Sequence, residues 1–576
     1  MILNYLTIEN FRNFKYVDLD LTNRNIIFGL NDIGKSNFLS ALRFLLDRNY
    51  RKNGFVDSDF YNRDISQSIN ITLKIDISDN EEDEDNRKIF SMMRGAITTQ
   101  ATSVFIQIRS TYDHETLVGE PLMYWGEDKD NLEEIPSSQT FYELDRYFNV
   151  VFIDSSIQLE NTFKRYSREI LKNHTSFSDE ERELLKTNIS KLNESVSKLE
   201  TIQKFEEDLS NEYRRFKEEK DFKLSIQSEI ELNNIHNKLT PYIQHENTGH
   251  YPTSGDGRKK LLAYTLLTLE NRRIEERKIN IFLVEELENH LHRSMQISLS
   301  YQIFNDELFK YLFMTTHSSL MVSQMDNVNL VKLFKNPNVV GASVVYKVPE
   351  EYMTLKQKLN QQLAEAIYAD IVLLVEGPSE KILFERVLNN KCERYESYGG
   401  YILEVDGINF KEYFDILTNL GITVIVKTDN DLQKVSGREE YNLLGLNRCR
   451  KLVNKNNIEK INDINPVEYE SNIQYSVDKK REIYVDNYSY INELEQDLIY
   501  LSRVDLEYDL AEIIPETIQD LATNNNSQKD GVEYLQSAKL INMIELCKVL
   551  NTDSINEIYN HDNFKCLKVM VDLCGQ

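Results

Sequence analysis

The stretch Leu374-Val375-Glu376-Gly377-Pro378-Ser379-Glu380 decides the fold of the C-terminal half of this chain. An apolar strand ends at Glu376, and a second carboxylate, Glu380, follows one helical turn later. The arrangement recurs where the apolar strand of residues 422–426 is followed by Lys427-Thr428-Asp429-Asn430-Asp431. Because open α/β sheets bind their ligands at the carboxyl ends of the strands, we expect the four carboxylates to share one site. Hard oxygen ligands of this kind suit Mg²⁺ or Mn²⁺.

This pair of acidic strand ends resembles the Toprim domain of topoisomerases, primases and nucleases. The resemblance implies phosphoryl-transfer chemistry at a divalent metal. The surrounding sequence fits, since a predicted helix at residues 352–369 leads into the first strand and another, at residues 383–388, follows it. A further apolar strand occupies residues 401–405. This alternation of strands and helices predicts a small parallel sheet.

A phosphate-binding loop lies near the N-terminus. Gly29-Leu30-Asn31-Asp32-Ile33-Gly34-Lys35-Ser36 matches G-x-x-x-x-G-K-[ST] and stands between a predicted strand (residues 25–28) and a predicted helix (residues 38–46). Backbone amides and the helix N-terminus of such a loop bind phosphate oxygens. Lys35 would reach the β- and γ-phosphates of ATP, and Ser36 would bind Mg²⁺. The residues expected to line the nucleotide here are Gly29, Asn31, Gly34, Lys35, Ser36 and Asn37.

Further motifs resemble the RecF/SMC/OLD group of ABC ATPases. Leu6-Thr7-Ile8-Glu9-Asn10-Phe11-Arg12-Asn13-Phe14 resembles the first strand and turn of that group, in which Arg12 would lie near the nucleotide. The apolar strand of residues 279–284 ends in Glu285 and Glu286 and resembles a Walker B strand. In that role Glu285 would hold Mg²⁺ through water, and Glu286 would orient the attacking water.

Two more segments fit the same group. Residues 253–259 resemble the ABC signature loop, whose Ser254 would cap a helix and point amides at the γ-phosphate bound by another protomer. An apolar strand ends at His317, which resembles the switch histidine. The chain departs from the family pattern at Leu287, where proline is usual, and at Arg293, which replaces the proline of L-H-P. We identify no Q-loop glutamine in the sequence.

The composition indicates a multidomain protein of a reducing compartment. Its 576 residues, 41% of them hydrophobic, suffice for roughly two to four domains. The five cysteines form no C-x-x-C pair, which argues against a disulfide framework or a zinc ribbon and fits the cytoplasm. No apolar run approaches the roughly 20 residues of a membrane span, so we expect no membrane association.

The net charge of −27 is unusual for an enzyme of nucleic acids. Global charge governs solubility and non-specific association rather than one face of the molecule, so DNA would bind in a local basic groove and at the metal. Basic clusters such as Arg448 with Arg450 and Lys451 are expected to be solvated helix faces, although some suit a phosphate track.

The order of the motifs predicts an α/β protein with two domains and an insertion. We expect an ABC-type P-loop ATPase domain in residues 1–156 and 241–347, and a Toprim domain with a C-terminal helical region in residues 348–576. Residues 157–240 are polar, lack glycine and proline, and space leucine and isoleucine at heptad-like intervals. This composition predicts a helical insertion, whose apolar stripe suits self-association.

A third acid group, in residues 500–510, resembles that of the OLD family of nucleases, which join an ABC ATPase to a Toprim domain. That family holds two metals with E-x-x-x-E, D-x-D, a later D-x-E and a downstream lysine. On this chain the motifs fall on Glu376 and Glu380, Asp429 and Asp431, Asp505 and Glu507, and Lys539. The lysine would stabilise phosphate charge or help activate water. Asp509 is a rival of Asp505 for the third acid position.

The resemblance covers essentially the whole chain and implies a function. It implies a metal-dependent endonuclease that nicks or cleaves double-stranded DNA in anti-phage defence, with a regulatory ATP-binding domain. It also implies a homo-oligomer, either a dimer or a tetramer, and a UvrD-like helicase as partner. The alternative is an ATP-gated DNA-binding clamp of the RecF/SMC type with an inactive Toprim domain, which the retained strand-end acids argue against. A primase would need a zinc ribbon, and a topoisomerase a tyrosine-bearing cleavage domain, for which no spare domain is evident.

Overall fold

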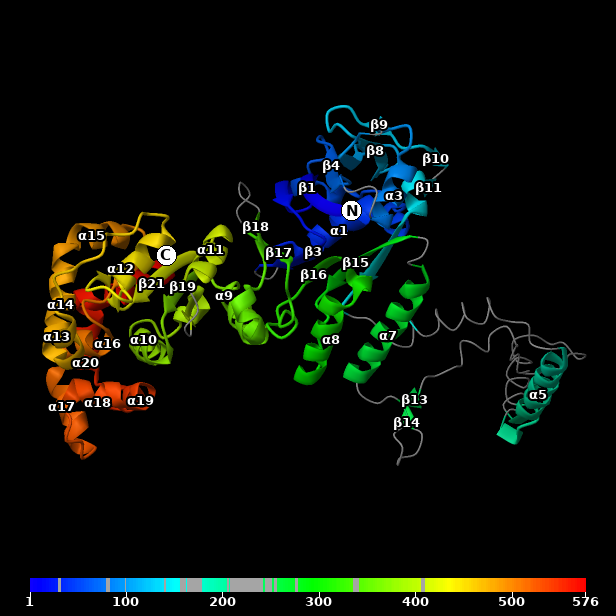
Figure 1. The fold of residues 1–576 in the computed structure, drawn as a ribbon. Coiled ribbons are helices and arrows are strands. Elements are labelled where there is room, and N and C mark those ends of the chain that lie inside the picture. Colours follow the sequence, from blue (N-terminus) through cyan, green and yellow to red (C-terminus); the bar gives the residue numbers. More distant parts are fainter. Residues whose placement is uncertain are drawn as a thin grey trace, which may run out of the picture. The chain divides into compact units, whose positions relative to one another are not determined.

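A computed structural model describes most of the chain, and its contacts divide the chain into two compact units (Figure 1). The first unit comprises residues 1–152, 281–286 and 296–576, and the second comprises residues 153–280 and 287–295. The described residues are 1–29, 33–78, 83–98, 100–138, 141–155, 162, 179–201, 203–204, 207, 242–243, 251–252, 256–274, 278–334, 341–405 and 410–575.

A mostly parallel sheet carries the phosphate-binding loop. Its strand order is β12 (Phe148–Ile153), β15 (Ile279–Glu285), β16 (Tyr311–Thr315), β3 (Arg24–Phe28), β17 (Val328–Leu333) and β18 (Gly341–Tyr346). Strands β15, β16, β3 and β17 are parallel, and β18 pairs antiparallel at the edge. Strand β16 is buried throughout and β15 is buried up to its last residue, Glu285, as expected of parallel strands that are covered on both faces.

A second, antiparallel sheet lies in the N-terminal part of the same unit. Its order is β2 (Phe14–Asp20), β1 (Ile2–Phe11), β4 (Ile69–Asp76), β5 (Ser103–Ser110), β8 (Leu122–Gly126) and β9 (Glu133–Glu134). Helix α1 (Lys35–Leu46) starts directly after the phosphate-binding loop and packs against strands of both sheets. Its buried face includes Phe38, Leu42 and Leu45, so the start of this helix is anchored by the core.

The C-terminal part of the first unit contains a four-stranded parallel sheet, which confirms the prediction of a small parallel sheet (Figure 1). Its order is β20 (Gly400–Glu404), β19 (Ile371–Val375), β21 (Thr423–Thr428) and β24 (Ile499–Leu501). Strand β19 pairs with both β20 and β21, and β21 pairs with β24. All carboxyl ends therefore meet at one edge of the sheet.

Helices cover this sheet and extend beyond it. Around the strands lie α9 (Lys356–Ala366), α10 (Pro378–Lys391), α11 (Phe410–Asn419), α12 (Leu444–Leu452), α13 (Pro466–Ser471), α14 (Ile473–Asp486) and α15 (Tyr488–Gln496). The C-terminal helices are α16 (Leu506–Ala511), α17 (Pro515–Asn524), α18 (Gly531–Ser537), α19 (Lys539–Val549), α20 (Thr552–Asn560) and α21 (Lys565–Cys574). They share one apolar core with β19 and α10, so the helical region is continuous with the sheet.

The predicted helix at residues 352–369 differs in detail from the structure. Residues Glu350–Leu355 form a 3-10 segment, and the α-helix α9 begins only at Lys356 and ends at Ala366. Ala366 is followed by a short connection into β19. The connection carries Tyr368, Ala369 and Asp370.

The second unit is described only in part. Helix α5 (Asp179–Ser197) carries Leu192 of the predicted heptad stripe, and this side chain is exposed. Helix α7 (Asp256–Ile274) is anchored by Lys260, whose Nζ donates to the carbonyls of Ser155 at 2.6 Å and Asn289 at 2.7 Å. The remainder of the predicted insertion lies outside the described residues. Within the described part of the chain, no helix is long and apolar enough to cross a membrane.

Candidate functional sites

The phosphate-binding loop closes around the start of α1. Lys35 is buried, and its Nζ donates to the carbonyl of Gly29 at 3.1 Å. Gly34 has φ of 104°, and a Cβ there would lie 2.3 Å from the side-chain amide of Asn13. The position therefore needs glycine for both its backbone angle and its space. Asn31, the remaining predicted member of the loop, lies outside the described residues.

Acidic and imidazole groups meet this loop at the ends of the adjacent strands. Ser36 donates a hydrogen bond to Glu285 at the end of β15. Glu286, the next residue, has a positive φ of 45°, and its backbone N–H donates to the carbonyl of Thr315 at 3.0 Å. Its side chain lies 3.5 Å from Nε2 of His317. The structure thus brings together the serine, both glutamates and the histidine that the sequence singled out.

Arg12 lies beside the same loop. Its guanidinium contacts Asp59 at 2.9 Å, the amide oxygen of Asn37 at 2.9 Å and the hydroxyl of Tyr50 at 3.2 Å. Asn13 had no role in our sequence-based site. It donates to the carbonyl of Ile33 at 2.8 Å and accepts from Asn37 at 2.7 Å. The turn after β1 therefore supports the loop from outside, while Ser254 lies beyond the described residues.

The second site forms at the carboxyl edge of the four-stranded sheet. Glu376 follows β19 and accepts hydrogen bonds from the hydroxyl of Thr428 and, at 3.0 Å, from the backbone N–H of Asp429. Glu380 lies in the first turn of α10. The two acidic strand ends are therefore adjacent, because β19 and β21 are neighbours in register.

The third acid group reaches the same edge from β24. Asp505 caps α16 by accepting from the N–H of Tyr508 at 2.9 Å, and its other oxygen accepts from Gln536 at 3.2 Å. Lys539 lies at the start of α19 with its Nζ 3.5 Å from Glu507. Glu507 is 1% exposed, and among the described residues its Oε2 has no hydrogen-bond partner. A buried carboxylate oxygen without a partner is costly and indicates a missing ligand.

The electrostatics show that these groups form one cluster. Burial, with the nearby charges of Glu376 and Glu507, raises the pKa of Glu380 to about 7. Burial and then the charge of Glu376 raise the pKa of Asp429 well above its usual value, and Glu380 and Asp505 add to the effect. Carboxylates perturbed in this way favour either a proton or a cation.

The two candidates for the third acid position face different partners. Asp509 is buried and lies 3.5 Å from Nζ of Lys427, which also donates to the carbonyl of Asn563 at 2.9 Å. Burial raises the pKa of Asp509, while Lys427 opposes the rise. Asp509 therefore has a structural partner behind the sheet edge, whereas Asp505 contributes to the raised pKa of Asp429.

Arg448 is a member of this site that the sequence did not reveal. It lies on α12 and contacts Glu376 and Asp431, although a solvated helix face was expected for its cluster. Asn430 was also missed. It is completely buried and donates to the carbonyls of Lys480 at 3.0 Å and Arg503 at 3.2 Å, which fixes the acidic loop. No local pattern in the sequence marks either residue, because both depend on how distant segments pack.

The donor set fits a divalent cation. It consists of clustered carboxylates, of which Glu380 and Asp429 have pKa values raised by burial and by their neighbours, and it includes the buried oxygen of Glu507 without a partner. As the side chains stand, no three acidic, histidine or cysteine groups among the described residues already enclose a metal position. One reason that the acids do not enclose a metal position is Arg448, whose guanidinium lies against both Glu376 and Asp431.

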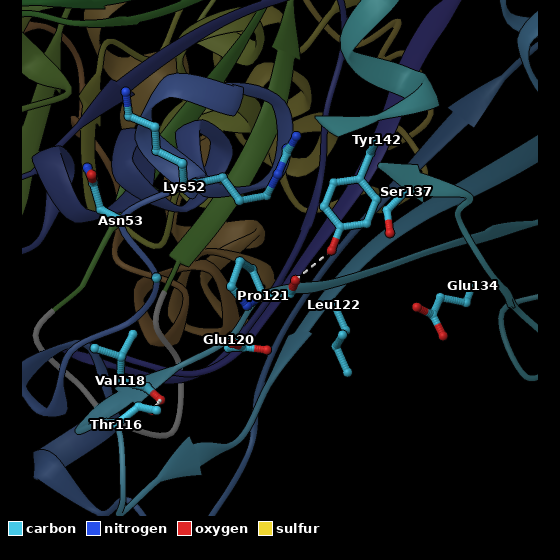
Figure 2. A pocket seen from close by; sticks show the side chains of 12 residues that line it. Lys52, Asn53, Thr116, Val118, Glu120, Pro121, Leu122, Glu134, Ser137 and Tyr142 are labelled. Carbon is cyan, nitrogen blue, oxygen red and sulfur yellow. Dashed lines mark hydrogen bonds between the residues drawn. The ribbon is translucent and has the colours of Figure 1, made fainter. Parts of the chain in front are cut away.

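A separate cavity of about 500 Å³ lies in the N-terminal part of the first unit and shares no residue with either site (Figure 2). Arg51 lines it, but its guanidinium is paired with Asp145 and donates to the carbonyl of Leu45 at 2.9 Å. The hydroxyl of Tyr142 donates to the carbonyl of Pro121 at 2.7 Å (Figure 2). These polar groups are satisfied within the fold, and the cavity suggests no chemistry.

Known proteins resemble this chain along its whole length. Residues 1–322 match the AAA ATPase domain family, and residues 367–431 match the TOPRIM domain of proteins like the overcoming lysogenization defect protein. Endonuclease GajA of Bacillus cereus (strain VD045) is 40% identical over 578 residues, which cover 99% of this chain and 99% of that protein. Endonuclease GajA of Bacillus cereus (strain HuB5-5) is 21% identical over 314 residues, or 47% of this chain and 44% of that protein.

Among solved structures, an SMC head bound to the C-terminal winged-helix domain of ScpA covers 61% of this chain and 99% of its own, with 12% identity and a TM-score of 0.35. The matched families define an N-terminal ATPase domain and a C-terminal Toprim domain, which are domain types that use a nucleotide and a divalent metal.

Proposed function

The chain belongs to the GajA family of endonucleases, and from that premise we propose that it is a divalent-metal-dependent endonuclease that nicks or cleaves double-stranded DNA. The observation that carries the proposal is the meeting of carboxylates from three strand ends at one edge of the Toprim sheet. Burial and then the neighbouring carboxylates raise the pKa values of Glu380 and Asp429. Perturbed carboxylates at strand ends suit phosphoryl transfer.

The proposed roles follow from the chain's own contacts. The residues that would hold Mg²⁺ or Mn²⁺ are Glu376, Glu380, Asp429, Asp431, Asp505 and Glu507. A bound divalent cation would polarise the phosphate and favour an ionised water. Lys539, which is exposed and lies beside Glu507, would stabilise the charge that develops on the phosphate.

The ATPase domain is proposed to bind ATP and to regulate cleavage. Lys35 would contact the β- and γ-phosphates, and Ser36 with Glu285 would hold Mg²⁺, as their hydrogen bond supports. Glu286 and His317 would orient the attacking water. The remaining residues proposed to contact the nucleotide are Gly29, Asn31, Gly34, Asn37 and Arg12, with Ser254 from another protomer.

The proposed setting is anti-phage defence in the cytoplasm, with a UvrD-like helicase as partner. The scattered, unpaired cysteines are consistent with a reducing compartment. A second protomer is needed because a signature-loop serine completes the ATP site of its neighbour. We therefore propose a dimer or tetramer, with residues 157–240 as the helical insertion that contributes to assembly and residues 348–576 as the nuclease domain.

Incubation of the purified protein with supercoiled plasmid and Mg²⁺ or Mn²⁺, without nucleotide, tests this function. An endonuclease produces nicked or linear plasmid that persists after the protein is removed. Relaxed, covalently closed plasmid would indicate a topoisomerase instead. Plasmid that is bound but unchanged would indicate an ATP-gated clamp with an inactive Toprim domain.

A further inference from the structure

Arg448 bridges the two acidic strand ends of the Toprim site. One guanidinium nitrogen donates to Glu376 and to the hydroxyl of Thr428, the latter at 2.6 Å. The other donates to Asp431 at 3.1 Å. Because Glu376 follows β19 and Asp431 follows β21, a single side chain links the ends of two neighbouring strands.

The position of Arg448 is built into the packing of α12. A Cβ on Gly445 would lie 2.2 Å from the backbone oxygen of Asp429 and 2.8 Å from the backbone nitrogen of Asp431, so only glycine allows this approach. The N–H of Gly445 also donates to the carbonyl of Asp431 at 3.0 Å. Residues three apart share one face of a helix, so this contact directs Arg448 at the acids.

A guanidinium in this position competes with a metal. Each of its hydrogen bonds occupies a lone pair of a carboxylate oxygen, and its positive charge repels a second cation at the same two carboxylates. We propose that Arg448 is a positioning residue that holds Glu376 and Asp431 in the metal-free site and is displaced from them by the divalent cation. The inference rests on the proposed function, because it requires this cluster to bind metal. The cation must then compete with a charge-assisted pair, so Arg448 lowers the affinity of the site for metal.

Mn²⁺ binding without DNA or nucleotide tests this step independently of cleavage. Electron paramagnetic resonance measures the free ion, and thus the bound Mn²⁺, for the wild type, Arg448→Gln and Lys451→Gln. The Mn²⁺ bound by Asp429→Asn is subtracted as binding outside the acid site. Lys451 is exposed on the same helix, so its variant removes the same charge without touching the acids. We expect Arg448→Gln to bind Mn²⁺ more tightly by about fivefold or more, and Lys451→Gln to stay within about twofold of the wild type.

Unchanged or weaker Mn²⁺ binding by Arg448→Gln would overturn the inference. An equal tightening in both variants would overturn it too, because general charge would then explain the effect. If the wild type and Asp429→Asn instead bind Mn²⁺ equally, the acid cluster does not bind this metal, and the proposed function itself fails. The two failures are therefore distinguishable.

A separate set of contacts connects the phosphate-binding loop with the strand that presents Glu376. The hydroxyl of Tyr368 donates to the carbonyl of Thr316, and its ring lies 5.7 Å from that of His317 and 5.9 Å from that of Phe28. Phe28 is the last residue of β3, directly before the loop. Tyr368 thus contacts both the strand that precedes the phosphate-binding loop and the predicted switch histidine.

The next two residues, Ala369 and Asp370, contact the sheet that carries the phosphate-binding loop. Lys332 of β17 is buried, and its Nζ donates to the carbonyl of Ala369 at 2.9 Å and lies 3.7 Å from Asp370. The chain then enters β19, which begins at Ile371 and ends beside Glu376. A shift of His317 on nucleotide binding would therefore displace the start of the strand that presents a metal ligand.

We infer that Tyr368 couples the nucleotide site to the acid site. The inference rests on the proposed binding of ATP and requires that ATP alter the affinity for DNA. Couplings of this kind typically change affinity by roughly 5- to 150-fold, and they act equally in both directions. DNA should therefore shift the affinity for ATP in the wild type by the same factor as ATP shifts the affinity for DNA.

Tyr368→Phe keeps the ring but removes the hydrogen bond, and Tyr368→Ala removes both. Tyr398→Phe, an exposed tyrosine in the Toprim part, is the control. We expect both Tyr368 variants to bind ATP and to cleave DNA without ATP within about twofold of the wild type. Their affinity for ATP should no longer respond to DNA, with the larger loss in Tyr368→Ala. An undiminished response in both variants, or none in a wild type that binds ATP and cleaves DNA, would refute the coupling and leave the nuclease intact.

Discussion

The ammonium of Lys427 lies 3.5 Å from a carboxylate oxygen of Asp509, and both side chains are almost fully buried, at 3% and 1% exposure. This pair stands directly behind the acidic edge of the Toprim sheet, since Lys427 lies on β21 just before Asp429. Asp505, four residues before Asp509, instead caps a helix and contacts Gln536. Two aspartates of one short segment therefore serve different purposes.

The first prediction separates these two aspartates. Asp509→Ala leaves the ammonium of Lys427 buried without its carboxylate, and breaking a buried pair costs about 3–5 kcal/mol. Asp505→Ala removes a helix cap, which costs about 1 kcal/mol, but also relieves repulsion among the acids. Thermal unfolding should therefore show a much lower Tm for Asp509→Ala alone, while Asp505→Ala remains folded and does not cleave DNA. The reverse pattern would exchange the roles of the two residues.

The second prediction concerns pH and the metal-free protein. The pKa of Glu380 is raised from 4.5 to about 7, so the folded protein binds the proton of this carboxyl more tightly than the unfolded chain does. The stabilisation of the folded protein by this proton is fully present below pH 4.5 and is lost as the pH rises through about 7. Glu380→Gln removes this titration. The variant should gain stability over the wild type by up to about 3 kcal/mol between pH 5 and pH 8. Thermal melts with chelator, with the exposed Glu393→Gln as control, measure the difference. Parallel pH profiles for wild type and Glu380→Gln would contradict the prediction.

The third prediction separates the two sites. Lys35→Ala should lose ATP binding, because Lys35 is the cation of the loop, yet keep DNA cleavage without nucleotide, because the acids lie on a different sheet. We also expect ATP to inhibit cleavage by the wild type but not by this variant, since a defence nuclease needs restraint in a healthy cell. Cleavage assays with and without ATP measure both effects. Stimulation of the wild type by ATP would show that the expected sign is wrong.

The fourth prediction concerns assembly. In the proposed ATP site a signature loop comes from a second protomer, so we expect at least a dimer at micromolar concentration. Light scattering measures this directly, and removal of residues 157–240 should lower the assembly state without changing the Toprim fold. A monomer of 67.7 kDa with and without ATP would contradict the expectation.

The sequence predicted the elements of both sites that are set locally. Glu376 and Asp429 were found because each follows an apolar strand directly, and parallel strands bring their carboxyl ends together. Arg448 was not found, because its direction depends on the close packing of Gly445 against a loop that no sequence pattern marks. The choice between Asp505 and Asp509 also stayed open, since only the position of Lys427 decides which carboxylate is already paired.

The ends of elements were less predictable than their existence. The strand expected at residues 422–426 extends in the structure to Thr428, whose hydroxyl then reaches Glu376. The helix expected at residues 352–369 begins as a 3-10 segment and ends at Ala366, and the non-helical residues that follow include Tyr368. In both places the extra contacts are with distant parts of the chain, which local propensity does not register.

The central claim is that the carboxylates at the Toprim sheet edge cleave DNA, and the cleavage rate of Asp429→Ala in Mg²⁺ or Mn²⁺ tests it most directly. The account predicts that Asp429→Ala and Glu376→Ala remain folded but lose cleavage of supercoiled plasmid altogether. The Tm of Asp429→Ala should equal or exceed that of the wild type, because this change relieves repulsion in the metal-free site. Full cleavage by both folded variants would contradict it.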